Sequence, residues 1–500
     1  MVRKEDLTNV ASDIHPPTAS SAGYFDAIVI GAGLGGLLSA AQLLRRGKRV
    51  VILERLPHSG GRFTAKNFQG AQVSTGAVHM IPFGSSGVLA RMLHLLRVPH
   101  HFFDADVFGS FHVNGKQYRS RGLLGVCKFL GPRQFFWFTR LGYLMFLRPL
   151  PAHEHQLPFD RWLARHINVK RNPQLVAFFE RISRFALSLE LSQVSTAEVI
   201  RITRYMLRYG APAIVQGGCA ELTRQLELHV REHGGTVHLS SPVLQILAED
   251  GRVSGVRLQD KASGTESIIH APLIVSDIGP RATQALLHGH RITQAEVLKP
   301  RPTATGNNGA QEATMREAVG LKVHVLSDIS LIPHKGIMYC LDTRRIAGIV
   351  QPTNSDPGLA PPGKHLLISH QVIQSDNIEE ERALALADLR MLFGAAFDTH
   401  CRVLTMGTYR GEWPVNRIAQ GEDTQPLTAL QGLYLVGDAV KPSGYLMVEG
   451  VAQSVNHFLD LLDEIEARKG QPNVVPPPPR IRALHWLFSV PPGPAADGKQ

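Results

Sequence analysis

The sequence predicts an α/β fold in which a discontinuous Rossmann-type domain is interleaved with an α+β capping domain. A strand-like run, a glycine-rich turn, a helix-like run and a second strand-like run follow one another between residues 25 and 53. This order is typical of the start of a parallel sheet. Apolar strand patterns return after residues 235 and 431, so the same domain resumes later in the chain. With 500 residues, the chain is too long for one compact domain.

The first unit is predicted from apolar spacing and stop signals. Phe25–Ile30 and Val50–Leu53 are short apolar runs, which are typical of buried strands. Between them, Leu34–Arg46 carries apolar residues at helical spacing and basic residues in its last turn, and Gly47 ends it.

Later elements follow from the same signals. Glu221–Glu232 predicts a helix that two glycines end, and Val448–Ile465 predicts another. We expect the remaining strands of this part of the chain at Thr236–Leu239, Val243–Ala248, Val253–Leu258, Ile268–Val275 and Gly432–Val436.

The glycine-rich turn predicts a dinucleotide site. Gly31 permits the tight turn after the strand, Gly33 leaves room for a diphosphate, and Gly36 lets the helix pack closely on the sheet. The start of the helix offers free N–H groups to the phosphates. Glu54 ends the second strand, where an acid accepts hydrogen bonds from ribose hydroxyls.

Two further stretches favour FAD over NAD. The sequence HSGGR places Gly61 and Arg62 directly after the acid, where backbone and guanidinium reach a second part of the ligand. Far along the chain, GLYLVGDA delivers Gly437 and Asp438 at the end of a strand, and a helix begins near Val448. An acid there can hold a ribityl chain, and a helix start stabilises negative charge on a reduced flavin.

These motifs divide the chain. Residues 1–23 are expected to form a disordered arm; 24–85, 214–285 and 428–466 the FAD-binding domain; 86–213 and 286–427 the substrate domain; and 467–500 a proline-rich tail. The piece 86–213 is mostly helical in pattern. In 286–427 we expect a flexible loop at 299–312 and strands at Leu321–Leu326, Ile337–Leu341, Ala347–Val350 and His365–Gln371.

The motif set resembles the FAD-dependent amine oxidase and phytoene desaturase superfamily. The matching stretches are GAGLGG with its acid and GGR, the mid-chain QGGCAELTRQLELHVREHGGTVHLSSPV, and GLYLVGDA with EGVAQS. The resemblance is strongest to the branch of carotenoid desaturases, carotenoid isomerases and retinol saturases. It implies FAD as cofactor, and it implies these cofactor-binding residues: Gly31, Gly33, Leu34, Gly35, Gly36, Glu54, Arg55, Gly61, Arg62, Val243, Gly437, Asp438, Met447 and Val448.

Two stretches depart from the family pattern. Pro57 and His58 stand where the family often has Gly-Arg, and the run from Lys441 to Tyr445 replaces a run of glycines. The flavin-side contacts and the particular reaction are therefore left open.

Two residues are candidates for catalysis. Lys322 lies in VGLKVHVL, and amine oxidases of this superfamily place a lysine on a strand beside the flavin. Strand alternation puts it on the face opposite Leu321 and Val323, so a solvent-facing lysine is the alternative. Trp413, in GEWPVNR, is a candidate wall for the flavin or substrate, with a structural turn as the alternative.

We expect an FAD-dependent oxidoreductase that desaturates or isomerises a hydrophobic polyisoprenoid or carotenoid. The alternatives are a flavin amine oxidase, a protoporphyrinogen oxidase-like enzyme and, less favoured, a non-catalytic prenyl-binding escort protein. The sequence does not indicate a disulfide framework or a metal site, because the four cysteines form no CxxC pair. It contains no nucleic-acid motif, although the net charge is +11.

The same reasoning predicts a cytoplasmic protein with peripheral membrane contact. There is no signal-peptide pattern and no apolar run long enough to span a bilayer. Two segments combine aromatic residues with arginine, as interfacial helices do: Arg133–Leu150 and the tail segment RIRALHWLFSV. Packing of the first segment inside the capping domain is the alternative.

Overall fold

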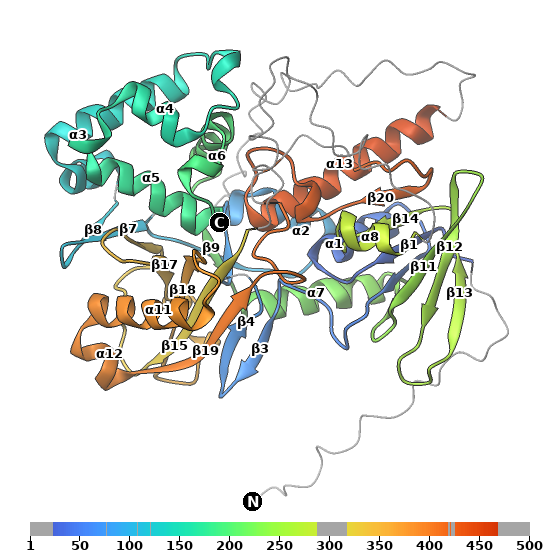
Figure 1. Ribbon diagram of the computed structural model, residues 1–500. Coiled ribbons are helices and arrows are strands. Elements are labelled where there is room, and N and C mark those ends of the chain that lie inside the picture. The colour runs from blue at the N-terminus through green and yellow to red at the C-terminus, as the bar shows by residue number, and fades with distance from the viewer. Residues whose placement is uncertain are drawn as a thin grey trace, which may run out of the picture. The chain divides into compact units, whose positions relative to one another are not determined.

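The computed structural model describes residues 24–76, 78–107, 109–120, 122–287, 318–418, 421 and 426–468 (Figure 1). The predictions for the N-terminal arm, the loop 299–312 and the segment RIRALHWLFSV lie outside the described residues. Residues up to Phe458 belong to one compact unit, and Leu459 begins a second, of which residues 459–468 are described.

A five-stranded parallel sheet combines strands from three distant parts of the chain. Its order is β10-β2-β1-β14-β20, and every pair in it is parallel. Most of these strands are completely buried, which is typical of a parallel sheet covered on both faces. The strands are β1 (Ala27–Ile30), β2 (Val50–Leu53), β10 (Thr236–His238), β14 (Ile274–Ser276) and β20 (Leu433–Leu435).

Helices and a second sheet accompany this parallel sheet. Helices α1 (Leu34–Arg45) and α7 (Gly218–Glu232) contact each other, and α13 (Met447–Arg468) follows β20. Short α8 (Pro280–Ala285) follows β14. An antiparallel sheet of order β11-β12-β13 is formed by Val243–Glu249, Arg252–Gln259 and Glu266–His270.

The prediction of a single strand over Ile268–Val275 is wrong. The segment contains the end of β13 and the start of β14, which belong to different sheets. Pro272 stands between them, and its missing N–H group and fixed φ angle do not allow one strand to continue.

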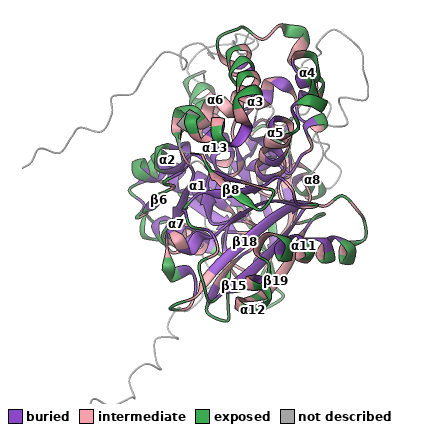
Figure 2. Cartoon of the chain, turned by 90° about the vertical axis from the view of Figure 1, so that its left-hand side faces the viewer, coloured by how far each residue is buried: buried purple, intermediate pink, exposed green. Residues whose placement is uncertain are grey.

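A seven-stranded mixed sheet forms the core of the second part. Its order is β19-β15-β18-β17-β16-β7-β8. The apolar cluster on one side includes residues of α5, and the cluster on the other includes residues of α11 and α12. Both faces are therefore covered, and all eight residues of β15 are buried (Figure 2). The strands are Gly109–Val113 (β7), Lys116–Arg119 (β8), Gly320–Ser327 (β15), Ile337–Cys340 (β16), Ile346–Val350 (β17), His365–Val372 (β18) and Cys401–Tyr409 (β19).

Smaller elements complete the described fold. One two-stranded sheet pairs β3 with β4, and one three-stranded sheet has the order β5-β9-β6. Helix α3 is kinked at Gly131, which has a positive φ and precedes a proline. The bounds are Ala65–Phe68 (β3), Ala71–Ser74 (β4), Met80–Ile81 (β5), Phe102–Asp104 (β6), Ala213–Val215 (β9), Val88–Leu96 (α2), Gly122–Phe146 (α3), Phe159–His166 (α4), Pro173–Ala186 (α5), Thr196–Tyr209 (α6), Ile378–Phe393 (α11) and Ala395–His400 (α12).

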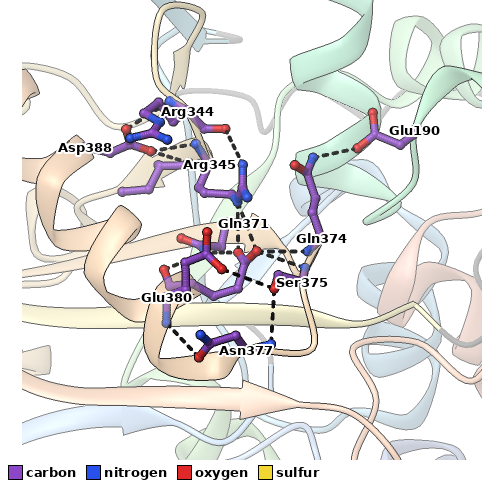
Figure 3. Close-up of polar contacts among 11 residues, drawn as sticks. Glu190, Arg344, Arg345, Gln371, Gln374, Ser375, Asn377, Glu380 and Asp388 are labelled. Atoms are coloured by element: carbon purple, nitrogen blue, oxygen red, sulfur yellow. Dashed lines mark hydrogen bonds and ion pairs between the residues drawn. The ribbon is translucent and has the colours of Figure 1, made fainter.

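Two buried carboxylates fix α11 to the loops at the ends of β17 and β18 (Figure 3). Glu381 accepts hydrogen bonds from the Arg345 guanidinium at 3.1 Å, from the Gln371 amide and from two backbone N–H groups. Asp388 accepts from three successive N–H groups, those of residues 344–346. These bonds hold the outer helix of the seven-stranded sheet in register with its strands.

Glu381→Ala should destabilise this part of the fold strongly. The change leaves the largely buried Arg345 guanidinium without its charge partner, and breaking a buried pair in this way costs about 3–5 kcal/mol. Urea unfolding followed by circular dichroism measures the shift in midpoint. Glu379→Ala is the matched control, because that carboxylate is exposed and its pair with Arg382 contributes about 0.2–1 kcal/mol. Equal midpoints for the two variants would contradict the assignment.

Candidate active site

A cavity of about 960 Å³ opens at the carboxyl ends of β1, β2 and β14 and reaches the seven-stranded sheet. This is the edge at which open α/β sheets bind ligands. Nearly all predicted site residues line it: Gly31, Gly33, Leu34, Gly35, Glu54, Arg55, Gly61, Arg62, Val243, Lys322, Trp413, Asp438, Met447 and Val448. Gly36 and Gly437 are not among the lining residues.

The glycine loop forms a cradle that side chains would fill. Gly31 has a φ of +97°, a region that favours glycine. A Cβ atom at Gly36 would overlap the carbonyl oxygen of Gly31, so the helix start packs directly on the turn. Helix α1 begins after Gly33, which has no side chain to cap it. Because the first N–H groups of a helix have no partner within it, this end of the cavity suits an anion.

Glu54 closes the cradle from the end of β2. One carboxylate oxygen accepts from the N–H of Ala32 at 2.7 Å, and the other accepts from the N–H of Leu56 at 2.8 Å. The side chain is buried and lines the cavity. Glu54 therefore fixes the glycine loop relative to β2, in addition to the role predicted from sequence.

An ion cluster joins the HSGGR stretch, which contains Arg62, to the C-terminal motif, which contains Asp438. The Arg62 guanidinium donates to Asp438 at 2.5 Å and also to the carbonyl of Pro414 at 3.1 Å. Arg417 donates to Asp438 from its backbone N–H and from its guanidinium. Burial alone would raise the pKa of Asp438, but the guanidinium groups of Arg62 and Arg417 lower it well below its usual range. Asp438 is therefore ionised at neutral pH.

Sequence analysis missed Asp277, which directly follows β14. Its carboxyl group lies against the Cα atoms of Gly33, Gly35 and Gly437, and it lines the cavity. Burial raises the pKa of Asp277 to about 7, although the Gly36 N–H and nearby guanidinium groups lower it. The sequence signal for Asp277 is its place at the carboxyl end of a parallel strand, but the apolar run Ile268–Val275 predicts one strand where the structure has β13 and β14.

Lys322 enters the cavity from the seven-stranded sheet. It lies on β15 opposite His370 of β18, and both residues line the cavity with Phe185 of α5. The solvent-facing interpretation is wrong, because Lys322 is 3% exposed. Its amino group lies 4.7 Å from the centroid of the Tyr409 ring, and burial lowers the pKa of Lys322 to about 7.

Trp413 belongs to a segment that runs along the cavity wall. The guanidinium of Arg55 lies 6.0 Å from its ring centroid, and both residues line the cavity. Arg62 holds the same segment through the carbonyl groups of Pro414 and Val415. Met447, which also lines the cavity, has a φ of +43° at the start of α13.

Comparisons with known proteins identify the class. The family of flavin-containing amine oxidoreductases matches residues 34–454. A crystal structure of an oxidoreductase from Methanosarcina mazei has a TM-score of 0.75 and 32% sequence identity, and covers 87% of this chain and 99% of that one. An uncharacterized protein of Methanocaldococcus jannaschii, MJ1488, is 29% identical over 87% of this chain and 99% of its own length.

Two carotenoid enzymes are more distant relatives. Prolycopene isomerase 1 of an Oncidium hybrid cultivar is 25% identical, over 84% of this chain and 80% of its own length. The neurosporene-forming phytoene desaturase of Rhodobacter capsulatus is 26% identical, over 50% of this chain and 52% of its own length.

The chain belongs to the flavin-containing amine oxidoreductase family. It is an FAD-dependent oxidoreductase with an α/β fold, as the sequence predicted. The residues in the cavity fit the cofactor, because the glycine cradle and the helix start suit a diphosphate and Glu54 suits a ribose. The individual contacts of the predicted FAD-binding residues remain proposals.

Gly33→Val should remove bound flavin. A Cβ atom at this position already overlaps the Asp277 carboxylate, and valine adds two methyl groups where the diphosphate is expected. The absorbance of flavin released from purified protein measures occupancy, which should fall to a small fraction of the wild-type value. Gly142→Val is the matched control, since a Cβ atom there meets open space. Full flavin content in Gly33→Val would place the diphosphate elsewhere.

Proposed function

We propose that this FAD-dependent oxidoreductase acts on a hydrophobic polyisoprenoid of the carotenoid class, by desaturation or isomerisation. The observation that carries the proposal is the wall of the cavity on the side of the seven-stranded sheet. The described lining residues include the apolar Val78, Met80 and Phe185, and they include one amino group, that of Lys322. The likeness to a prolycopene isomerase and a phytoene desaturase supports the same substrate class.

The charges of the cavity argue against a cationic amine substrate. Of its carboxylates, Glu54, Asp277 and Asp438 lie at the ends of the parallel strands, where the cofactor is expected. Lys322 lies instead on the seven-stranded sheet, beside His370 and Phe185. Among the described residues that line the cavity, no carboxylate of the seven-stranded sheet is present to pair with a protonated amine, whereas a hydrocarbon needs no charged partner.

The chain's own residues orient the reactants and control one proton. FAD, when bound, would supply the redox chemistry as the acceptor of a hydride equivalent. The apolar wall orients the polyene and excludes water. Because the pKa of Lys322 is about 7, its amino group can hold or release a proton at neutral pH. Arg62 and Asp438 keep the two flavin-side loops together.

Anaerobic mixing of the holoenzyme with candidate polyenes tests the substrate class. Bleaching of the flavin absorbance, with a product carrying one more double bond, supports desaturation. Conversion of a cis polyene to its trans isomer without net flavin bleaching supports isomerisation. Bleaching by diamines or porphyrinogens, with no change in any polyene, would contradict the proposal and favour the amine oxidase or porphyrinogen oxidase alternatives.

Lys322→Met should slow turnover while FAD stays bound. If the neutral amine accepts a proton, the wild-type rate rises with pH through about 7, because deprotonation then provides the base. The variant should lose this step in the pH profile and fall about 10²–10⁴-fold in rate. Lys364→Met, at an exposed surface pair, is the control. A wild-type profile in Lys322→Met would leave the lysine without a role in turnover.

We propose further that the enzyme collects its substrate at a membrane surface through α3. Four large apolar side chains on α3 and the turn after it are exposed: Leu124, Phe136, Tyr143 and Leu147. Beyond the kink at Gly131 the helix buries Leu141 and Met145 in the core, so one face of that part packs inward and another faces solvent (Figure 2). Arg140, whose guanidinium lies 5.2 Å from the Trp137 ring centroid, adds positive charge beside this face.

Sedimentation with anionic vesicles tests this docking. Wild-type protein should pellet with the vesicles, and less so at high salt, because arginine contacts are screened. Phe136→Asp/Tyr143→Asp should weaken pelleting at least about tenfold, since two exposed aromatic contacts are replaced by like charges. Flavin content and circular dichroism check the fold. Wild-type protein that stays in the supernatant at low salt would contradict docking. Among the described residues, no helix is both long and apolar enough to cross a bilayer.

A further inference from the structure

Asp277 occupies the part of the cavity that the glycine cradle prepares for an anion. Its two carboxylate oxygens lie against Gly33 and Gly35 at the start of α1, and against Gly437 of the C-terminal motif. It also accepts a hydrogen bond from the backbone N–H of Gly36. The carboxyl group therefore uses one of the donors at the helix end where a diphosphate is expected.

The charges around Asp277 do not balance when a diphosphate is added. Three charged groups face it: Arg62 from the loop after β2, Arg417 from the segment before β20, and Asp438 after β20. Asp438 is already paired with both guanidinium groups. A dianionic diphosphate beside an ionised Asp277 would thus leave excess negative charge in a site that protein surrounds.

We propose that FAD binds to this chain together with one proton, which Asp277 takes up so that a neutral carboxyl group faces the diphosphate. The proton comes from solvent and no bond other than O–H forms. This inference concerns the cofactor alone and is independent of the substrate.

The direction of the pH dependence follows from linkage. Without FAD, Asp277 titrates near pH 7, because burial raises its pKa to about 7. A neighbouring diphosphate raises that pKa further, since it repels the carboxylate. The protonated form therefore binds FAD more tightly, and affinity is lost as pH rises above about 7. Asp438 stays ionised throughout, because its guanidinium partners keep its pKa low despite burial.

The proposal can be tested by removing flavin from the full chain and titrating the protein with FAD in a calorimeter. At about pH 8, buffers of different ionisation enthalpy report how many protons are taken up per FAD bound. Wild-type protein should take up close to one proton, and its Kd should rise up to about tenfold per pH unit between about pH 7 and 9. Asp277→Asn keeps the shape of the side chain but cannot titrate. When it binds FAD, this variant should therefore take up nearly one proton fewer than wild type, and its Kd should stay almost constant over the same pH range.

The difference between the two proteins is the decisive quantity, because Lys322 and Glu449 also have pKa values near 7. Asp250→Asn, at an exposed carboxylate in the turn between β11 and β12, should behave as wild type. Equal proton uptake by wild type and Asp277→Asn would overturn the proposal. A wild-type Kd that stays constant between about pH 7 and 9 would also overturn it, and this measurement does not depend on whether the variant folds.

Discussion

The ion pair between Arg62 and Asp438 is the contact on which the geometry of the site depends. It joins two loops that lie 376 residues apart in the sequence, one after β2 and the other after β20. The same guanidinium also holds the carbonyl groups of residues 414 and 415, so it positions a third segment of the cavity wall. Because both partners are largely buried, removal of either is more costly than loss of a surface pair, even though Arg417 still pairs with Asp438 when Arg62 is absent.

Local motifs made the cofactor part of the site predictable. The glycines of the turn Gly31–Gly36 allow the backbone to approach a ligand closely, and Glu54 stands at the end of a strand. Both features depend on residues that are close in sequence. The second strand of the unit, β2, has the predicted bounds. The C-terminal motif was also predicted, because Gly437 and Asp438 directly follow a short buried strand.

The environment of Lys322 was not predictable in this way. Strand alternation indicated two different faces for β15, but helices that come far earlier and later in the chain cover both faces. Helices α11 and α12 and strand β19 were not predicted, and α11 is fixed by Glu381 and Asp388, whose partners lie in distant loops. Asp277 was missed because Pro272 divides an apolar run that looked continuous.

The order of strands in the parallel sheet has a consequence for biosynthesis. Strands β1, β2, β10 and β14 are all made before residue 277, but β20, which pairs with β14, and Asp438 come near the end of the described chain. Because a chain emerges from the ribosome N-terminus first, the edge of β14 stays unpaired until the whole second sheet has been made. The complete cofactor site therefore forms only after β20 has been made, and a ligand that binds the complete site shifts this last folding step toward the native state by mass action.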